Sequence, residues 1–171
     1  MPARCGSLSH GGEGIAAPFA DFEGEVRPEW IDSNGHLNLA YYVVLFDQGT
    51  DAVYDAMGIG AAYRPTGHGT FAAETHTLYA QELVLGDRVR VTSQIIGLDG
   101  KRLHLAHEMH RIADGRLAAA QEILFLHVDL RLRRVVPWLA PVLPRLQAAA
   151  AAHAALAMPD WVGRRIELRR G

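Results

Sequence analysis

One stretch of the chain, residues 39–46, limits its folding more than any other because it is apolar on every side of a helix. A helix that is apolar all round is stable in water only when other elements enclose it. From Asp47 to Asp55 an aspartate recurs at every fourth position, which predicts one wet face further along the helix. Gly58 supplies a C-terminal stop. We therefore expect a helix over residues 37–57 whose first half is completely buried.

Strand-like segments flank this helix on both sides. Patterns of apolar and β-branched residues predict a short strand at 22–26 and four longer ones at about 70–82, 89–96, 103–112 and 117–128. Asp-Gly turns at residues 99–100 and 114–115 are hairpin signals, so we expect the four longer strands to form an antiparallel meander. An Ala- and Leu-rich stretch, 137–157, predicts a terminal helix. Since nothing else is large enough to bury the first helix, the fold class is α+β, with one long sheet wrapped around that helix.

Length and charge restrict the domain organisation and the partners. The chain has 171 residues, enough for one domain with its own core, and a net charge of -2, which gives no general attraction to nucleic acid or to an anionic membrane. Residues 1–18, rich in Gly, Ser and Ala, predict a disordered tail. We place the domain at 19–135, with a C-terminal helix and basic tail, 136–171, packed on it.

The lack of paired cysteines and of a long apolar run indicates the cellular compartment. Cys5 is the single cysteine, so a disulfide framework is excluded and a reducing cytoplasm fits best. No run of about 18 apolar residues is present, which argues against a membrane-spanning helix.

The helix entry carries the most specific motif of the chain. It reads Asp32-Ser33-Asn34-Gly35-His36-Leu37-Asn38 with Tyr42 one turn later. Together with the order of strands and helices, this motif resembles the 4-hydroxybenzoyl-CoA thioesterase group of hotdog-fold enzymes. The stretches 27–32, 74–76, 101–105 and 126–129 are more closely similar to the betainyl-CoA thioesterases of carnitine breakdown. The resemblance implies a hotdog fold and hydrolysis of a small acyl-CoA, with betainyl-CoA as the leading substrate.

Asp32 is the catalytic residue that the resemblance implies. A carboxylate can attack the thioester to give an acyl-enzyme anhydride, or it can activate water. We expect Gly35 and His36 to present backbone N–H groups at the first turn of the helix, where they would polarise the thioester oxygen. The structural alternative for Asp32 is an ordinary helix N-cap.

The remaining candidates follow from their positions around that motif. Asn38 and Tyr42 are expected to order the turn and line the pocket, or else to be satisfied locally. Glu74 and His76 share one face of a strand that can lie beside a partner's helix start. Glu74 is then a second catalytic carboxylate or a counter-charge for a cationic substrate, and a surface pair is the alternative. If the substrate carries trimethylammonium, the rings of Trp30, Tyr41 or Phe46 can bind it, although core packing also explains them.

The coenzyme A tail is polyanionic, so arginines or lysines should lie near the mouth of the pocket. Arg102 is the main substrate-binding candidate, and the other candidates are Arg64, Lys101, Arg131, Arg133 and Arg134. No cofactor is expected, since the substrate brings its own coenzyme A.

A metal site is not expected. His104, His107 and His110 are the obvious cluster, but strand alternation places His107 on the opposite face from the other two.

The predicted sheet also bears on assembly, and the motif leaves two rival functions open. A curved sheet with an exposed edge favours at least a homodimer with active sites between subunits. The rival enzyme is a hotdog hydratase, whose His-Asp arrangement on the following strand is absent. The rival outside enzymes is a non-catalytic acyl-CoA-binding or regulatory hotdog protein.

Overall fold

The computed structural model describes residues 15–168 of the chain. In chain order its elements are β1 (Phe19–Glu25), η1 (Pro28–Trp30), α1 (Leu39–Met57), η2 (Ala61–Thr66), β2 (His68–Tyr79), β3 (Arg88–Leu98), β4 (Arg102–Arg111), β5 (Leu117–Asp129), β6 (Arg134–Val135) and α2 (Leu143–His153). The two-residue strand β6 and both short 3-10 helices lay outside the sequence expectations.

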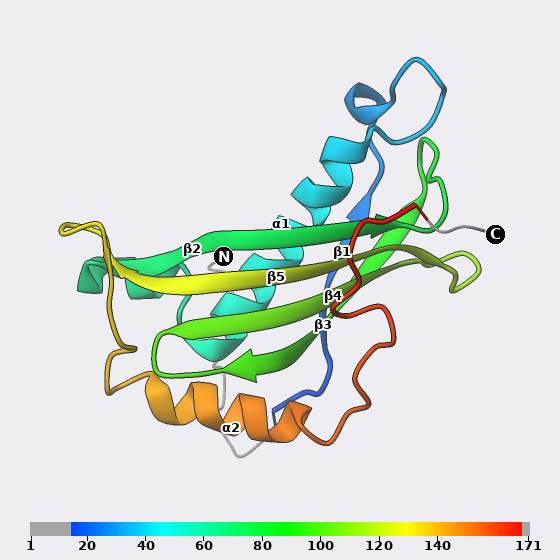
Figure 1. Cartoon of the computed structure of the whole chain (residues 1–171). Coiled ribbons are helices and arrows are strands. Elements are labelled where there is room, and N and C mark those ends of the chain that lie inside the picture. Colours follow the sequence, from blue (N-terminus) through cyan, green and yellow to red (C-terminus); the bar gives the residue numbers. More distant parts are fainter. Residues whose placement is uncertain (1–14, 169–171) are drawn as a thin grey trace, which may run out of the picture.

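The strands form a single antiparallel sheet in the order β1-β3-β4-β5-β2 (Figure 1), and β6 pairs with β5. Both Asp-Gly hairpins are confirmed, because β3 pairs with β4 and β4 with β5. The meander prediction is wrong for β2, which pairs with β5 at the far side of the sheet. A tight turn brings consecutive strands together, but the longer connection from β2 to β3 leaves the choice of partner to tertiary packing.

Helix α1 lies across the concave face of this sheet (Figure 1). Leu45 and Phe46 are completely buried in a cluster with Val91 and Met109. At Gly49 an added Cβ would lie 2.8 Å from Val91 Cγ1, so the missing side chain is what lets the helix approach β3 so closely. Helix plus wrapped sheet is the α+β hotdog arrangement predicted from the sequence.

The expectation that the first half of α1 is buried all round is wrong for the single chain. Leu39 is 64% exposed and Val43 is 39% exposed, and Val44 is exposed beside them. One curved sheet covers one side of a helix, and the opposite side has no cover within the described residues. The aspartates at 47, 51 and 55 are exposed as predicted.

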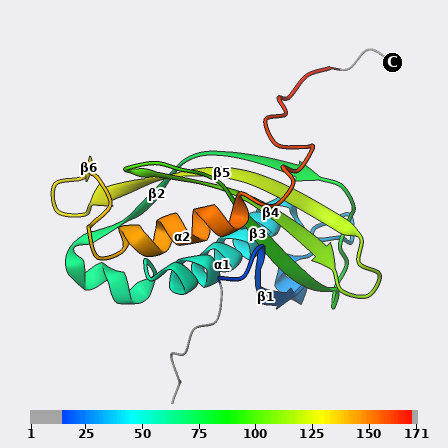
Figure 2. The same cartoon turned by 90° about the horizontal axis from the view of Figure 1, so that it is seen from below.

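The C-terminal segment runs over both faces of the sheet. Helix α2 is shorter than predicted and lies on the same side of the sheet as α1 (Figure 2). Beyond it, Trp161 is buried on the outer face, where its Nε1 donates to Glu108 at 2.9 Å. Of the predicted N-terminal tail, residues 1–14 lie outside the described part, whereas Ile15 packs against the core. No described helix is long and apolar enough to cross a membrane.

Candidate active site

The segment before α1 folds into a tight turn. Ile31 and Leu37 form an isolated antiparallel bridge, and the Asp32 N–H donates to the His36 carbonyl at 3.0 Å. Gly35 has a φ of +84°, a left-handed conformation that glycine adopts at little cost. The turn therefore places the Asp32 and His36 side chains together at the entry of the helix.

Asp32 is held in this turn with part of its carboxylate accessible. Its Oδ1 accepts the Asn34 N–H at 2.8 Å, and its Oδ2 lies 3.7 Å from Nδ1 of His36. The Asp32 side chain is 21% exposed. The carboxylate thus caps a turn, as the structural alternative required, while its side chain stays partly accessible.

The expectation that Gly35 and His36 lie in the first helical turn is wrong. Helix α1 begins at Leu39, and its N-cap is Asn38, whose Oδ1 accepts the Ala40 N–H at 3.0 Å. The Gly35 N–H already donates to the Asp32 carbonyl at 3.1 Å. Within residues 15–168 no acceptor takes the His36 N–H. Of the two N–H groups expected to polarise the thioester, only that of His36 is therefore free.

Tyr42 ties the start of α1 to the segment that follows β2. Its hydroxyl donates to the Gln81 carbonyl at 3.2 Å and accepts the Leu83 N–H at 3.0 Å. With 4% of its surface exposed, Tyr42 is a core residue and does not line an open pocket. Burial raises the pKa of Tyr42, which therefore stays a neutral hydrogen-bonding group.

We expect Tyr42→Phe to lower the free energy of unfolding by about 1–3 kcal/mol, because it leaves the buried Leu83 N–H without an acceptor. Tyr54→Phe is the matched control: that buried hydroxyl has no hydrogen-bond partner among the described residues, so its removal should cost much less. Urea unfolding of both variants measures the difference. Equal destabilisation would show that the Tyr42 hydrogen bonds contribute little.

Trp30 and Tyr41 are stacked on each other, with ring centroids 5.3 Å apart. The guanidinium of Arg27 lies 5.0 Å above the Trp30 ring, and Trp30 is buried in the core. Phe46 is completely buried. These three rings are therefore engaged in packing, and Trp30 already has a cation of its own.

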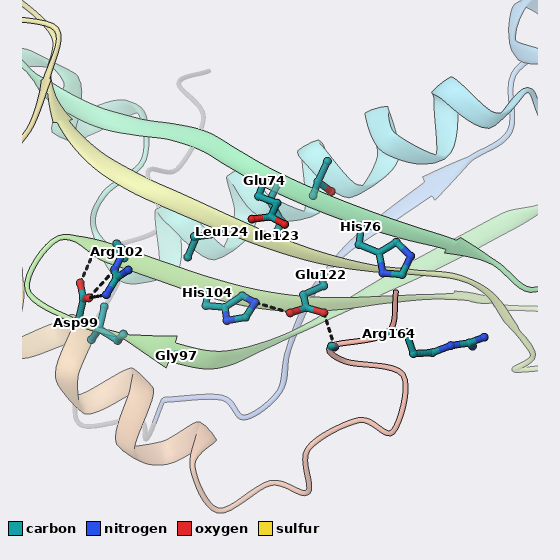
Figure 3. A pocket seen from close by; sticks show the side chains of 13 residues that line it. Glu74, His76, Gly97, Asp99, Arg102, His104, Glu122, Ile123, Leu124 and Arg164 are labelled. Carbon is teal, nitrogen blue, oxygen red and sulfur yellow. Dashed lines mark hydrogen bonds and ion pairs between the residues drawn. The ribbon is translucent and has the colours of Figure 1, made fainter. Parts of the chain in front are cut away.

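Glu74, His76 and Arg102 come together in a pocket of about 530 Å³ on the outer face of the sheet, away from α1 (Figure 3). We call it the outer pocket. Two further side chains that sequence reasoning did not place here, His104 and Glu122, also line it, with 2.9 Å between His104 Nε2 and Glu122 Oε1. The Gly163 N–H donates to Glu122 at 2.7 Å, so the C-terminal segment closes one side.

Glu74 and His76 were expected to lie beside the helix entry of a partner subunit, and that expectation stays a prediction for the single chain. Strand alternation does place Glu74 and His76 on one face, but that face points away from the helix entry of the same chain (Figure 3). The alternation of β4 was also a usable signal for His104. No sequence signal indicated that residues 163–164 lie over the outer pocket, because a chain segment without regular structure has no periodicity.

The basic residues expected near coenzyme A are spread over several places. Arg102 forms an ion pair with Asp99 at 2.6 Å, Arg64 lies beside the α1 aspartates, and Arg133 lies 5.5 Å above the Phe71 ring. Arg131 and Arg134 are exposed near the β5–β6 turn, and Lys101 is exposed in the β3–β4 hairpin. They do not form one cluster.

The histidines of β4 alternate as predicted. His107 is completely buried on the concave face, whereas His104 and His110 lie on the outer face and pair with Glu122 and Glu108. Among residues 15–168 no group of three or more His, Cys, Asp or Glu side chains is arranged to hold a metal ion.

A hotdog sheet around a helix, with a partly open carboxylate at the entry turn of that helix, defines the structural class of this protein. The chain belongs to the thioesterase-like superfamily, whose family model matches residues 26–165. It is 40% identical over 148 residues to a betainyl-CoA thioesterase of Pseudomonas aeruginosa, a match that spans 86% of this chain and 93% of that protein.

Two further likenesses agree with this assignment. The chain is 34% identical to an L-carnitine dehydrogenase/betainyl-CoA thioesterase of Rhizobium meliloti, over 91% of this chain and 31% of that longer protein. Among solved structures, a hypothetical protein from Staphylococcus aureus in complex with CoA superposes with a TM-score of 0.81 at 25% identity, covering 92% of this chain and all of that one.

Proposed function

We propose that this acyl-CoA thioester hydrolase acts on betainyl-CoA and releases betaine and coenzyme A. The observation that carries the proposal is Asp32, a partly open carboxylate in a turn that also holds a free backbone N–H at His36. The acyl group is supported by the 40% identity with the betainyl-CoA thioesterase of Pseudomonas aeruginosa.

Asp32 has two chemical routes to the same products. As a nucleophile, its oxygen bonds to the thioester carbonyl carbon, the C–S bond breaks to give an anhydride and the coenzyme A thiolate, and water then hydrolyses the anhydride. As a general base, it takes a proton from water as the water oxygen bonds to the carbonyl carbon; the C–S bond then breaks, and the proton can pass to the departing coenzyme A thiolate. In both routes the carbonyl oxygen gains negative charge, and the His36 N–H is the donor we assign to it.

The outer pocket is our candidate for part of the coenzyme A tail. Arg164 lines it and forms no ion pair within the described residues, so its charge is available to a phosphate. Glu74 lies in the same pocket, so a catalytic role for it needs a second copy of the chain. No other cofactor is required, and a cytoplasmic location is part of the proposal.

We further propose a homodimer built through the β2 edges. Among the described strands β2 pairs with β5 alone, and at its end Tyr79 contacts Leu39, one of the exposed apolar residues of α1. A long unpaired edge next to apolar surface is what a second copy would cover, and a two-fold axis would continue the sheet from one copy into the other.

The dimer has a direct test at the exposed face of α1. We expect the wild type to sediment at twice the chain mass of 18.7 kDa, and Leu39→Glu combined with Val43→Glu to give monomers. Charges there would have to be desolvated on association, which is costly. Val135→Glu, an exposed apolar position on β6, is the matched control and should remain dimeric. A dimeric double variant would place the interface elsewhere.

The substrate proposal is tested by thiol release from a panel of betainyl-, acetyl-, butyryl- and benzoyl-CoA. We expect the highest kcat/KM for betainyl-CoA. Turnover without that preference would retain the thioesterase and reject the acyl group. Binding of all four thioesters with no turnover would instead indicate a non-catalytic acyl-CoA-binding protein.

A further inference from the structure

A second hollow lies between the later part of α1 and the first half of β2, with a volume of about 690 Å³. We call it the acidic groove. Asp47, Asp51 and Asp55 line it from the helix, and Arg64 is the single cationic side chain among its described lining residues. Burial, with repulsion from the other two aspartates, raises the pKa of Asp51, and Arg64 opposes that rise. The groove therefore concentrates negative charge that a ligand cation would relieve.

The floor of the acidic groove is aromatic. Tyr54 and Phe125 pack edge to face with centroids 5.4 Å apart, and both line the groove. Tyr54 is 9% exposed, and its buried hydroxyl makes no hydrogen bond within residues 15–168; Thr70 is a polar neighbour without proper bonding geometry. An unpartnered polar group at the base of a hollow is a position prepared for a ligand atom or an ordered water.

We propose that the acidic groove is the subsite for the cationic end of the acyl group, a small quaternary ammonium. Carboxylates and aromatic rings are the groups that bind such cations, since trimethylammonium has no N–H to donate and is attracted by charge and by ring faces. This inference rests on the proposed function, because it assigns one part of the betainyl-CoA substrate to one part of the molecule.

The acidic groove binds the cationic end of a substrate whose carbonyl is attacked by Asp32 of a second copy, not by Asp32 of its own chain. Asp51 lies about 20 Å along the helix axis from Asn38, at a rise of ~1.5 Å per residue. In a betainyl thioester the nitrogen is one methylene away from the carbonyl that Asp32 attacks. One chain therefore cannot hold both ends of this acyl group.

Antiparallel pairing of two β2 edges brings the two parts together. About a two-fold axis, the start of β2 in one copy lies beside the end of β2 in the other. The acidic groove adjoins the start of β2, at residues 69–72. The end of β2 adjoins the helix entry, because the Tyr79 hydroxyl donates to the Leu39 carbonyl at 3.3 Å. Each groove would thus face the Asp32 turn of the other copy.

The first test compares betainyl-CoA with 3,3-dimethylbutyryl-CoA, its neutral isostere. We expect Asp47→Asn with Asp51→Asn to lower kcat/KM for betainyl-CoA about tenfold and to leave the neutral thioester unchanged within about twofold. Both aspartates are exposed, so the variant should fold. Asp160→Asn, an exposed carboxylate outside both hollows, should change neither substrate.

Two results would overturn the subsite. One is an equal change for both thioesters in the double variant, or no change at all. The other is loss of the preference for betainyl-CoA in Glu74→Gln with the double variant unaffected, which would move the counter-charge to the outer pocket.

The second test separates the two copies with tagged heterodimers. When Asp32→Asn is on one chain and the Asp47/Asp51 changes are on the other, one of the two sites is intact, and about half of the wild-type betainyl-CoA rate should remain. When all changes are on the same chain, we expect about a twentieth, from one inactive and one weakened site. The reverse order of these two rates would show that groove and turn act within one chain.

Failure of the substrate proposal can be distinguished from failure of the subsite. Tetramethylammonium chloride should inhibit hydrolysis of acetyl-CoA by the wild type, at ionic strength matched with sodium chloride, and not by the Asp47/Asp51 variant. That result would support the cation subsite even if betainyl-CoA were a poor substrate. Equal inhibition of both proteins would overturn it.

Discussion

Replacing Asp32 by Asn is expected to lower kcat for acyl-CoA hydrolysis about a thousandfold while leaving thermal stability close to that of the wild type. The structure gives the reason for the separation of the two effects. The bond that holds the turn is the acceptance of the Asn34 N–H by Oδ1, and an asparagine oxygen can accept the same hydrogen. What the variant lacks is the negative charge needed to attack a carbonyl or to take a proton from water.

The control for this prediction is another turn aspartate. Asp129 accepts the N–H groups of Arg131 and Leu132 at 2.9 and 2.8 Å, so Asp129→Asn makes the same change of charge in a comparable turn. It should keep its activity. Thiol release and thermal unfolding are measured for both variants, with binding of a non-hydrolysable acyl-CoA as a further readout. If Asp32→Asn lost stability and activity in equal measure, Asp32 would be a capping residue only.

The second large effect is a loss of stability at low pH, and it is expected from His107. This completely buried side chain of β4 is hydrogen-bonded to α1 and to β3. Ser93 Oγ lies 2.7 Å from its Nδ1, and Thr50 Oγ1 lies 3.2 Å from its Nε2. Because Thr50 donates its hydrogen to the Phe46 carbonyl, it accepts from Nε2–H, and Ser93 then donates to Nδ1. With the imidazole neutral in this tautomer, both ring nitrogens and both hydroxyl hydrogens have a partner.

Burial lowers the pKa of His107 from 6.5 to about 4. Between these two pH values the unfolded chain binds a proton that the folded protein rejects. The free energy of unfolding is therefore fully retained above pH 6.5 and falls by about 3 kcal/mol as the pH is lowered to about 4. Urea unfolding across that range measures the loss.

His107→Gln isolates this contribution. Burial also lowers the pKa values of His127 and His153, which add losses of the same sign, so the informative quantity is the difference between wild type and variant. We expect the variant to be less stable at pH 7, where two buried hydroxyls lose a partner, and to lose less stability on acidification. A pH dependence identical to that of the wild type would show that His107 is not the group responsible.

Features encoded in neighbouring residues were predictable. Helix α1 ends at Met57 before Gly58, whose φ of +74° suits glycine, and the two Asp-Gly turns form the hairpins expected of them. The motif around Asp32 pointed to the turn that the structure contains. In each case the determining interactions connect residues a few positions apart, so periodicity and turn chemistry were sufficient.

Features that depend on distant residues were not predictable. The partner of β2, the outward direction of Glu74 and the position of residues 163–164 over Glu122 all depend on how segments far apart in the chain pack together. The Gly35 N–H is a different case: the expected oxyanion role required it to be free, but it donates to the Asp32 carbonyl three residues earlier, a local bond that the sequence interpretation overlooked.

The pattern of the chain thus suffices for a sheet wrapped around a helix, because helix periodicity and turn residues are local, whereas the hotdog class and the role of Asp32 were implied by the resemblance of the motif at residues 32–42. The three-dimensional packing alone separates the outer pocket from the acidic groove and leaves the β2 edge and one face of α1 uncovered. The free energy of burying a surface depends on which segments meet there, and that choice is made over the whole fold.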